Sequence, residues 1–257
     1  MKAKNLALTL MFNTAERPLA IYAHPDDEVI GATYAMKECS EDLSLVFATD
    51  GAPSIENSPE YYYPVSHYQY GQEYINLRRQ EAKNVAAILG LKRPLKFMGL
   101  TDSMLHLQIP QLVNGIRKVI EDVNPDLIIT HAYEGGHLDH DLVVAAIWKI
   151  LSETQRDIIV CETPLYSKDG ERITHNQRIN RHSSWQTLSV TPDPQKARAM
   201  TAYASQQIDL QYFDPQVLEH YHFQSQPQFA SMRELPNCEA TLYGKEFHSF
   251  ILQLLQE

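Results

Sequence analysis

The sequence has few cysteines, and their positions argue against two kinds of site. Cys39, Cys161 and Cys238 are the three in the chain, they lie far apart, and none belongs to a CxxC pair. A disulfide scaffold uses an even number of cysteines and a thiolate zinc site uses closely paired ones, so neither is indicated. Cys161 stands in an apolar run and is expected to be a small buried hydrophobe.

Basic residues are in the minority. The 257-residue chain has 22 Lys and Arg against 32 Asp and Glu, which gives a formal charge of −10. A surface that binds nucleic acid needs clustered Lys and Arg to displace counterions, so we expect no nucleic-acid partner. The acidic balance fits a neutral or cationic small-molecule substrate, but solubility explains it equally well.

Long apolar segments are also missing. The apolar stretch at residues 5–12 is short, breaks at Asn13 and has no small-residue cleavage site, so it does not predict a signal peptide. No stretch of the sequence is long enough to span a bilayer. We therefore expect a soluble, cytoplasmic protein without a membrane span. The sequence leaves the oligomeric state open, a homo-oligomer included.

The order of predicted elements indicates the fold class. No run rich in Gly, Ser or Pro separates two periodic regions, so we expect a single domain over residues 1–257. Short apolar strands (19–23, 43–48, 95–98, 127–130 and 158–160) alternate with helical patterns (29–39, 71–89, 109–123 and 141–151). This alternation predicts an α/β fold, a Rossmann-like three-layer sandwich with a mainly parallel central sheet. No G-x-G-x-x-G follows the first strand, so the usual dinucleotide cofactor is not predicted.

The last third of the chain is less regular, and we expect it to help shape the substrate pocket. Residues 163–191 lack helical periodicity and are typical of short antiparallel strands. A helix is expected from Pro192 to about Ser205, and a closing amphipathic helix over 246–255. Residues 53–70 form a long, tyrosine-rich loop, for which a substrate-covering role and an ordinary surface position are equally supported.

One stretch concentrates the chemistry. Residues 23–28, Ala-His-Pro-Asp-Asp-Glu, follow the first predicted strand, and the carboxyl ends of strands are where open α/β sheets bind ligands. A tight turn can point His24 and Asp27 at one centre while Asp26 faces elsewhere. Imidazole and carboxylate are both zinc ligand types. A third ligand is offered far downstream, in His-Leu-Asp-His at 137–140.

These segments resemble the two motifs of the PIG-L/LmbE-like N-acetylglucosaminyl deacetylase family. The first motif matches over its whole length. The second, Glu-Gly-Gly-His-Leu-Asp-His-Asp at 134–141, matches except that Leu138 stands where the family commonly has proline. The resemblance implies a metal-dependent hydrolase that removes the N-acetyl group from an N-acetylglucosamine-like amino sugar or its conjugate.

The resemblance also implies a role for each motif residue. His24, Asp27 and His140 match the family's metal triad, and this ligand set suits Zn²⁺ as well as Fe²⁺. Asp26 is expected to be the general base that accepts a proton from water and later delivers it to the amine. His137 is expected to face the developing oxyanion.

Several of these residues have simpler explanations. Asp26 can cap the following helix, as aspartate often does. Arg78, in Arg-Arg-Gln-Glu at 78–81, resembles the family's Arg-x-x-Glu, whose arginine helps to hold the substrate, but an exposed helix charge is equally supported. Asp50 and Asp102 each follow a strand near a turn, where they can bind sugar hydroxyls or simply stabilise the turn.

Three further positions stand outside the predicted site. Asp139 can hold an adjacent histidine in orientation. Residues 196–206 resemble the family's late Lys…Ser-Gln segment, but Tyr203 stands where histidine is often found, so no role is assigned to it. The remaining histidines, His131 among them, have no motif around them and are expected to be structural or exposed.

Two other functions compete with the zinc-dependent N-deacetylase. One is a metal-dependent hydrolase of another amide or ester, because site geometry rather than fold decides the substrate. The other is a non-catalytic, ligand-binding member of the same fold. A nucleotide-dependent oxidoreductase is disfavoured by the missing glycine fingerprint.

Overall fold

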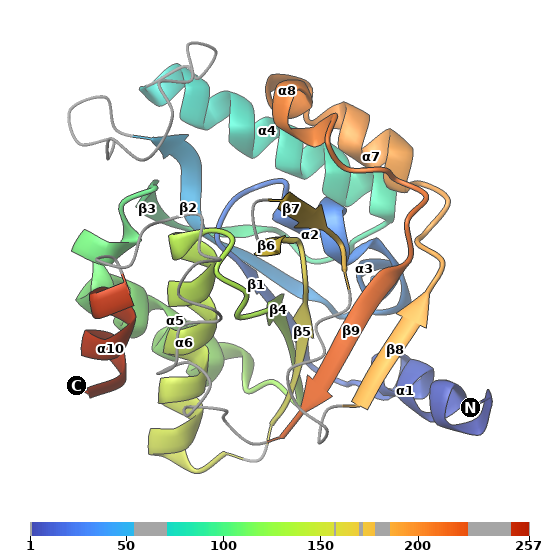
Figure 1. Ribbon diagram of the computed structural model, residues 1–257, viewed down its shortest axis with the longest axis horizontal. Coiled ribbons are helices and arrows are strands. Elements are labelled where there is room, and N and C mark those ends of the chain that lie inside the picture. The colour runs from blue at the N-terminus through green and yellow to red at the C-terminus, as the bar shows by residue number, and fades with distance from the viewer. Residues whose placement is uncertain are drawn as a thin grey trace.

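A mostly parallel, seven-stranded sheet forms the centre of the structure (Figure 1). The computed structural model describes residues 2–53, 71–156, 158–169, 172–177, 186–225 and 248–256. The strands lie in the order β3-β2-β1-β4-β5-β9-β8; β1 to β5 pair in parallel, and β9 pairs antiparallel with β5 and β8. Their bounds are β1 (Pro18–Tyr22), β2 (Ser44–Pro53), β3 (Lys96–Asp102), β4 (Leu127–His131), β5 (Ile159–Thr163), β8 (Gln186–Val190) and β9 (Glu219–Gln224). The predicted Rossmann-like α/β fold is confirmed.

The central strand β1 shows how the sheet divides the core. All of its residues are buried, as expected for a parallel strand with helices on both faces. Leu19 and Ile21 belong to one apolar cluster, and Ala20 and Tyr22 belong to a second. Successive side chains of a strand point to opposite faces, so the two clusters lie on opposite sides of the sheet.

Helices cover both faces and make the sheet the middle of three layers (Figure 1). α5, α6 and α10 pack in the cluster of Leu19, and α1, α2, α3, α4 and α7 pack in the cluster of Tyr22. The bounds are α1 (Lys2–Thr14), α2 (Asp27–Gly31), α3 (Thr33–Glu38), α4 (Gln72–Leu89), α5 (Ile109–Val123), α6 (Leu138–Thr154), α7 (Lys196–Ala202) and α10 (His248–Gln256). Helix α5 buries Leu112, Ile116 and Ile120, which recur at the spacing of one helix face.

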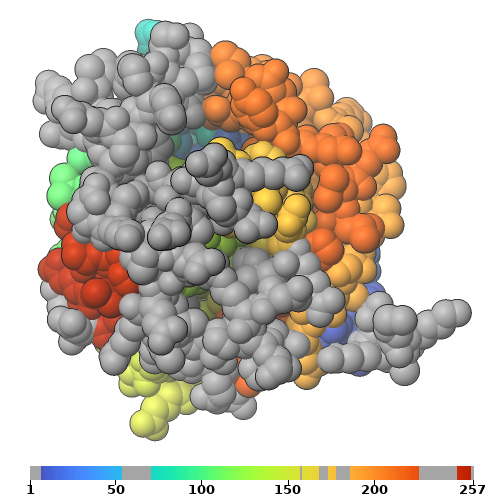
Figure 2. Space-filling model, in the orientation of Figure 1, coloured from blue at the N-terminus to red at the C-terminus, as the bar shows by residue number. Residues whose placement is uncertain are grey.

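Smaller elements complete the described part of the chain. β6 (Tyr166–Asp169) and β7 (Arg172–His175) form an antiparallel hairpin separate from the main sheet. The short helices are η1 (Leu105–Leu107), η2 (Ala204–Gln206) and α8 (Gln207–Leu210). On the face shown in Figure 2, atoms of the hairpin (yellow) lie at the surface beside the segment from α7 to β9 (orange). β6, β7 and β8 confirm the short strands expected within residues 163–191.

Most of the predicted helices are observed. The predicted helix over 109–123 matches α5, and the helix expected over 71–89 matches α4, which ends at Gly90 in a left-handed conformation with φ 79°. Such an end is typical of glycine, which has no Cβ to oppose a positive φ. The helix expected over 246–255 is α10, whose first described residue is His248.

The single helix expected over residues 29–39 is wrong. The structure has two short helices there, α2 and α3, with a break at Ala32, whose φ is −139°. Glu219 of β9 accepts hydrogen bonds from the backbone N–H groups of Thr33 and Tyr34 at 3.0 and 2.8 Å. The distant carboxylate thus caps a new helix start, which local periodicity does not reveal.

The described cysteines are free thiols, and no described helix fits a membrane span. Cys39 and Cys161 are free and buried, as Cys161 was expected to be. Among the described residues, no helix combines the length and apolarity needed to cross a bilayer. Cys238 and most of the tyrosine-rich loop, residues 54–70, lie outside the described part.

Candidate active site

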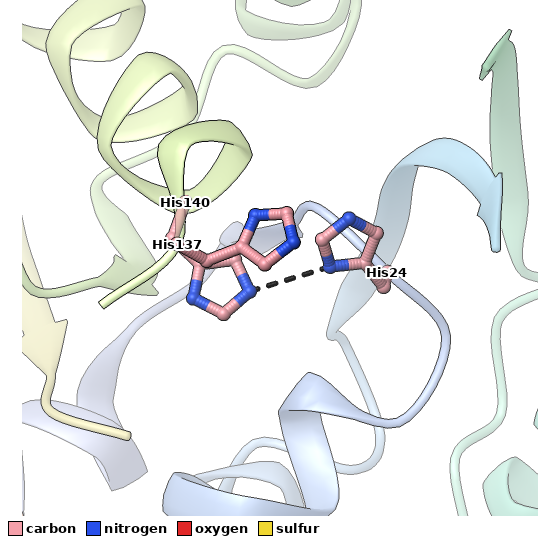
Figure 3. Close-up of side chains that lie close together, drawn as sticks. All are labelled: His24, His137 and His140. Carbon is pink, nitrogen blue, oxygen red and sulfur yellow. Dashed lines mark hydrogen bonds between the residues drawn. The ribbon is translucent and has the colours of Figure 1, made fainter. Parts of the chain in front are cut away.

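The candidate site lies where β1 and β4 end. These strands are neighbours in the sheet, and the strand order reverses between them, since β2 and β3 follow on one side and β5 on the other. Such a switch point is where open α/β sheets bind ligands. The chain after β1 supplies His24 and Asp27. The start of α6 supplies His137 and His140, which lie beside His24 (Figure 3).

Three proposed metal ligands meet at this point. His24 Nδ1 lies 3.3 Å from Asp27 Oδ2, and His140 Nε2 lies 3.2 Å from Asp27 Oδ1. The two histidine nitrogens are 3.3 Å apart, as the dashed line in Figure 3 marks. Two ligands bound at about 2.0–2.1 Å to a tetrahedral ion are about 3.3 Å apart. The two histidine nitrogens therefore have the spacing of two ligands of one ion, and each faces a different oxygen of Asp27.

The second nitrogen of His24 is held by two carboxylates. His24 Nε2 lies 3.1 Å from Asp102 Oδ1 and 3.3 Å from Asp139 Oδ2. Burial lowers the pKa of His24, but the carboxylates of Asp102 and Asp27 outweigh it and raise that pKa well above its usual value. In the neutral form of His24, the two carboxylates at Nε2 favour the proton on that nitrogen, which directs the lone pair of Nδ1 toward Asp27 and His140. Asp139 thus orients the distant His24 rather than a neighbouring histidine.

Asp27 is ionised in this environment. Burial raises its pKa, but His140, His131 and His24 more than offset burial and hold the pKa well below its usual value. A carboxylate and two imidazole nitrogens directed at one buried point form a donor set that fits a divalent cation. Among the described residues, three overlapping groups could hold a metal ion: His24, His137 and His140; Asp27, His131 and His140; and His24, Asp102 and Asp139.

His131 is a residue of the site that the sequence did not reveal. Its Nε2 accepts a hydrogen bond from the backbone N–H of Ala23 at 2.8 Å, so this lone pair is not available to a metal. Its ring stacks on His140 with centroids 4.0 Å apart and an interplanar angle of 6°. The Nε2 atom of His131 is therefore occupied by the backbone, and its ring packs against His140. A histidine that ends a buried strand was the only signal.

His137 lies beside His24 and His140, at the start of α6. It occupies the N-cap position of α6, where its Nδ1 accepts a hydrogen bond from the Asp139 amide at 3.1 Å. Its ring centroid is 4.7 Å from that of His24 and 4.8 Å from that of His140. Burial, with His24 and His140 nearby, lowers the pKa of His137 well below its usual value. The neutral ring then carries its proton on Nε2, as a hydrogen-bond donor.

Asp26 adopts an unusual backbone conformation. Its φ of 134° lies in a region that costs a non-glycine residue about 1–3 kcal/mol. It precedes α2, but its side chain makes no capping hydrogen bond, so the capping explanation does not hold. Its Oδ2 instead lies 3.2 Å from Nη2 of Arg78. Burial raises the pKa of Asp26 to about 7, although Arg78 opposes this.

Arg78 is not the exposed helix charge that the sequence also allowed. Its relative exposure is 1 %, and its Nη2 donates a hydrogen bond to the carbonyl oxygen of Pro25. Gly51, with φ 65°, makes room for it, because a Cβ there would lie 2.8 Å from Arg78 Nε. The guanidinium is thus built into the turn that carries Asp26.

Asp50 and Asp102 are both engaged by the protein itself. Asp50 Oδ1 accepts a hydrogen bond from Arg79 Nε at 2.9 Å, and Asp102 Oδ1 accepts one from Ser103 Oγ at 2.9 Å besides facing His24. Asp102 therefore lies at the site, through its contact with the triad. Their binding of sugar hydroxyls stays a prediction.

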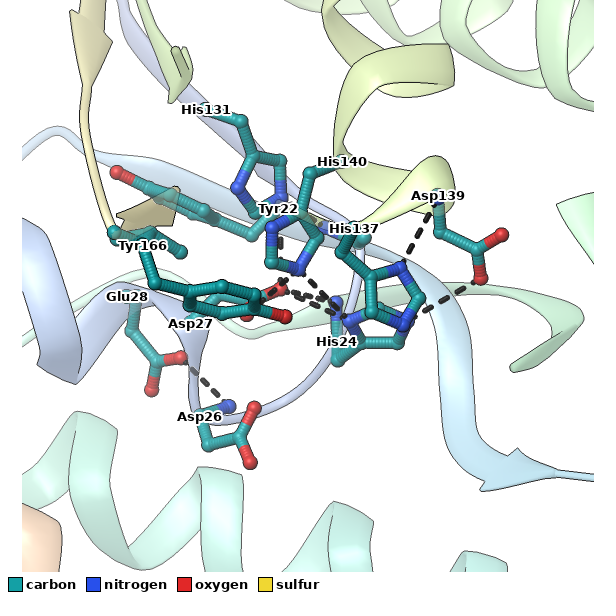
Figure 4. Close-up of polar contacts among 12 residues, drawn as sticks. Tyr22, His24, Asp26, Asp27, Glu28, His131, His137, Asp139, His140 and Tyr166 are labelled. Carbon is teal, nitrogen blue, oxygen red and sulfur yellow. Dashed lines mark hydrogen bonds and ion pairs between the residues drawn. The ribbon is translucent and has the colours of Figure 1, made fainter. Parts of the chain in front are cut away.

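The hairpin β6–β7 reaches the site through Tyr166. The tyrosine ring points toward the histidine cluster, with its centroid 5.5 Å from that of His140 (Figure 4). Gly136 allows this approach, since a Cβ there would collide with the carbonyl oxygen of Tyr166. Leu138, which replaces the family's proline, is the buried first residue of α6. The start of this helix therefore places His140 without a proline.

Comparisons with known proteins agree with this geometry. The family model described as PIG-L: GlcNAc-PI de-N-acetylase matches residues 19–151. A Bacillus anthracis protein, Probable N-acetyl-alpha-D-glucosaminyl L-malate deacetylase 2, is 31% identical over 197 residues, which are 73% of this chain and 80% of that protein.

Solved structures show the same fold. A deacetylase of teicoplanin biosynthesis is similar with a TM-score of 0.62 and 16% identity, over 81% of this chain and 97% of that one. The A40926 pseudoaglycone deacetylase Dbv21 is similar with a TM-score of 0.59 and 16% identity, over 82% and 98%. The family match and the bacterial relative identify the sequence: the chain belongs to the PIG-L family.

Proposed function

We propose that this protein is a metal-dependent N-deacetylase that hydrolyses the N-acetyl group of an N-acetylglucosamine-like amino sugar or its conjugate. The observation that carries the proposal is the close approach of His24, Asp27 and His140. The two histidine nitrogens lie 3.3 Å apart, and each lies 3.2–3.3 Å from a different oxygen of Asp27. Family membership supports the reaction, and the name of the bacterial relative supports a sugar conjugate as the substrate class.

We propose Zn²⁺ or Fe²⁺ as the metal, held by His24, Asp27 and His140. Both ions accept imidazole and carboxylate ligands. One solved structure similar to this chain is described as the zinc-inhibited form of a teicoplanin deacetylase, so both metals need testing. When bound, the ion lowers the pKa of a coordinated water to about 7 and polarises the amide carbonyl.

Asp26 is proposed as the group that moves the proton. Hydrolysis forms a bond between the water oxygen and the acetyl carbon and breaks the bond between that carbon and the amide nitrogen. The Asp26 carboxylate accepts the proton of the attacking water and delivers it to the leaving nitrogen, so that acetate and a free amine result. Arg78, 3.2 Å away, holds this carboxylate in place.

His137 is proposed as the donor to the oxyanion. Its Nδ1 is occupied by the Asp139 amide, which leaves Nε2–H as its donor. A hydrogen bond aimed at the oxygen on which charge develops contributes about 10²–10³ in rate. The buried position of the ring among His24 and His140 keeps this donor beside the triad.

The test is acetate release from a panel of N-acetylated sugars, other N-acyl amines and esters, with the metal content of each sample measured in parallel. Wild-type protein is expected to release acetate from an N-acetyl sugar. Asp26→Asn is expected to lose about 10²–10⁴ in rate and keep its metal, since the base is not a ligand.

The matched control for Asp26→Asn changes a carboxylate far along the chain. Asp193→Asn alters an exposed carboxylate that accepts a hydrogen bond from the Gln195 amide, and should leave the rate unchanged. Cleavage of only other acyl groups would favour the alternative hydrolase. Metal binding without any turnover would favour a non-catalytic, ligand-binding protein. Full activity in Asp26→Asn would contradict the proposed base.

A further inference from the structure

Tyr203 lies behind the candidate site and reaches the backbone of Asp26 through one intermediate residue. It follows α7, is 0% exposed, and its hydroxyl donates a hydrogen bond to Glu28 Oε1 at 2.6 Å. The other oxygen of Glu28 accepts a hydrogen bond from the backbone N–H of Asp26 at 3.0 Å. A continuous chain of hydrogen bonds therefore connects α7 to the turn that carries the proposed base.

The ring of Tyr203 supports Asp26 by a second route. The guanidinium carbon of Arg78 lies 5.6 Å from the centroid of the Tyr203 ring, within the range of a cation–π contact. Arg78 in turn lies 3.2 Å from the carboxylate of Asp26. One tyrosine thus contacts both residues that hold Asp26, one at its backbone and one at its side chain.

Asp26 needs such support. A residue with φ 134° stays in that conformation only when its surroundings over-determine it. α2 is five residues long and cannot fix the turn before it by its own hydrogen bonds. The Glu28 carboxylate is the group that accepts the Asp26 amide, so its position decides whether the turn keeps its shape.

The segment that carries Tyr203 is itself fixed at both ends. Lys196, at the start of α7, donates hydrogen bonds from Nζ to the carbonyl oxygen of Ile30 at 2.6 Å and to Glu219 at 3.0 Å. Ser205 donates from its amide and its hydroxyl to Glu81 of α4, at 2.8 and 2.6 Å. The tyrosine therefore projects from a rigid segment onto the turn.

We infer that Tyr203 is a positioning residue, which holds Asp26 in its active geometry through Glu28 and Arg78. The kinetic part of this inference rests on the proposed function. The structural part, the anchoring of the Asp26 amide, does not depend on the reaction.

The test compares two buried tyrosines. Tyr203→Phe removes the hydroxyl and keeps the ring over Arg78. Tyr221→Phe is the matched control, because Tyr221 is also 0% exposed and its hydroxyl donates to a buried carboxylate, Glu219 Oε2, at 2.7 Å. Tyr221→Phe also loses the hydrogen bond that the Tyr221 hydroxyl accepts from the Ala35 amide at 3.1 Å, so the control is the more disruptive of the two changes. Only Tyr203→Phe loses a bond to Glu28.

The first measurement is amide hydrogen exchange in the full-length protein, read in the peptide that contains residues 24–29. Tyr203→Phe is expected to speed exchange at the Asp26 amide about tenfold, in line with the loss of one buried hydrogen bond. Tyr221→Phe should leave this peptide unchanged. Tyr203→His, which offers a donor in place of the hydroxyl, should recover part of the protection and serves if Tyr203→Phe does not fold.

The second measurement is kinetic. Tyr203→Phe should lower kcat about tenfold, with KM and metal content close to wild type, and Tyr221→Phe should keep kcat. If Tyr203 acts through Glu28, the double variant Tyr203→Phe/Glu28→Gln should lose no more rate than Glu28→Gln alone.

The two measurements separate the two claims. Unchanged exchange at Asp26 in Tyr203→Phe, or equal losses of kcat in Tyr203→Phe and Tyr221→Phe, would overturn the inference. A wild-type protein that releases acetate from none of the substrates would overturn the proposed function, and the exchange result would still decide whether Tyr203 anchors Asp26.

Discussion

Two regions of the molecule contribute different groups to the candidate site and its surroundings. One region consists of the turns after β1 and β4, and the other is the segment from α7 to β9. The turns supply the side chains that meet at its centre, His24, Asp27 and His140. The later segment supplies Tyr203 and Glu219, whose hydrogen bonds end on other protein groups. The comparison indicates that the reactive groups come from two short motifs, while the shape of the turns depends on residues far along the chain.

This difference predicts that substitutions in the two regions fail in different ways. Changes in the turns should remove metal or turnover from a folded protein, because these side chains meet at one buried point. Changes between α7 and β9 should first lower the free energy of unfolding, because their carboxylates and hydroxyls fix helix ends and turns. The two regions can therefore be told apart by whether a substitution first affects metal binding and turnover or the free energy of unfolding.

Removal of the metal should have the largest effect. Treatment with a chelator is expected to reduce acetate release by roughly 10³-fold or more, because the pKa of the water returns from about 7 toward that of bulk water. One equivalent of Zn²⁺ or Fe²⁺ should restore the rate, and the melting temperature should fall and recover with it. Full activity in a protein shown to be free of metal would contradict the assignment.

Glu219→Gln should cause the largest loss of stability. Glu219 pairs with Lys196 at 3.0 Å and accepts the amide of Thr33, and neither Glu219 nor Lys196 is more than 1% exposed. Removing the charge of one partner of a buried ion pair lowers the free energy of unfolding by about 3–5 kcal/mol. Urea unfolding measures this loss. The folded fraction should keep its metal. Glu153→Gln, which breaks partly exposed pairs with Lys149 and Arg117, should cost about 1 kcal/mol or less.

Asp139→Asn should weaken the metal site from outside the triad. Asp139 Oδ2 faces His24 Nε2 at 3.3 Å and accepts the amide of Ser103 at 2.8 Å. Loss of such a partner typically lowers metal affinity about 10- to 100-fold, measured by competition with a chromophoric chelator. Asp102→Asn should have a comparable effect, because Asp102 Oδ1 lies 3.1 Å from the same nitrogen. An unchanged affinity in both variants would show that His24 needs no carboxylate to hold its ring.

Ser205→Ala should have the smallest effect. Its hydroxyl donates to Glu81 at 2.6 Å, but the Ser205 amide donates to the same carboxylate and remains in the variant. The expected loss is about 1 kcal/mol of unfolding free energy. Ser152→Ala, on the exposed side of α6, removes a comparable hydroxyl and should cost less. A loss of metal in Ser205→Ala would contradict the expectation that residues between α7 and β9 affect stability before metal binding.

The sequence predicts the parallel strands β1 to β5 and their helices better than the antiparallel strands β8 and β9. Strands buried on both faces are continuous apolar runs, and α5 shows its buried stripe in the helical spacing of Leu112 and Ile116. The break at Ala32 escapes prediction, because it depends on Glu219, which is far away in the sequence. The pairing of β9 with β5 is a tertiary contact of the same kind.

The residues of the site also differ in whether the sequence could predict them. His24, Asp27 and His140 could be named because a motif places them after strands that share one edge of the sheet. His131 and Tyr203 could not, because their roles arise from stacking on His140 and from a bond to Glu28. Neither contact leaves a pattern in the sequence.

The most direct test of the central claim is the metal content of purified protein, determined by inductively coupled plasma mass spectrometry. Wild-type protein is compared with His140→Ala, which removes one of the three proposed ligands, and with His220→Ala as a control. His220 lies on β9, where it pairs with Ser189. We expect one metal ion per chain in the wild type and the control, and its loss in His140→Ala. A metal-free wild type, or an unchanged metal content in His140→Ala, would contradict it.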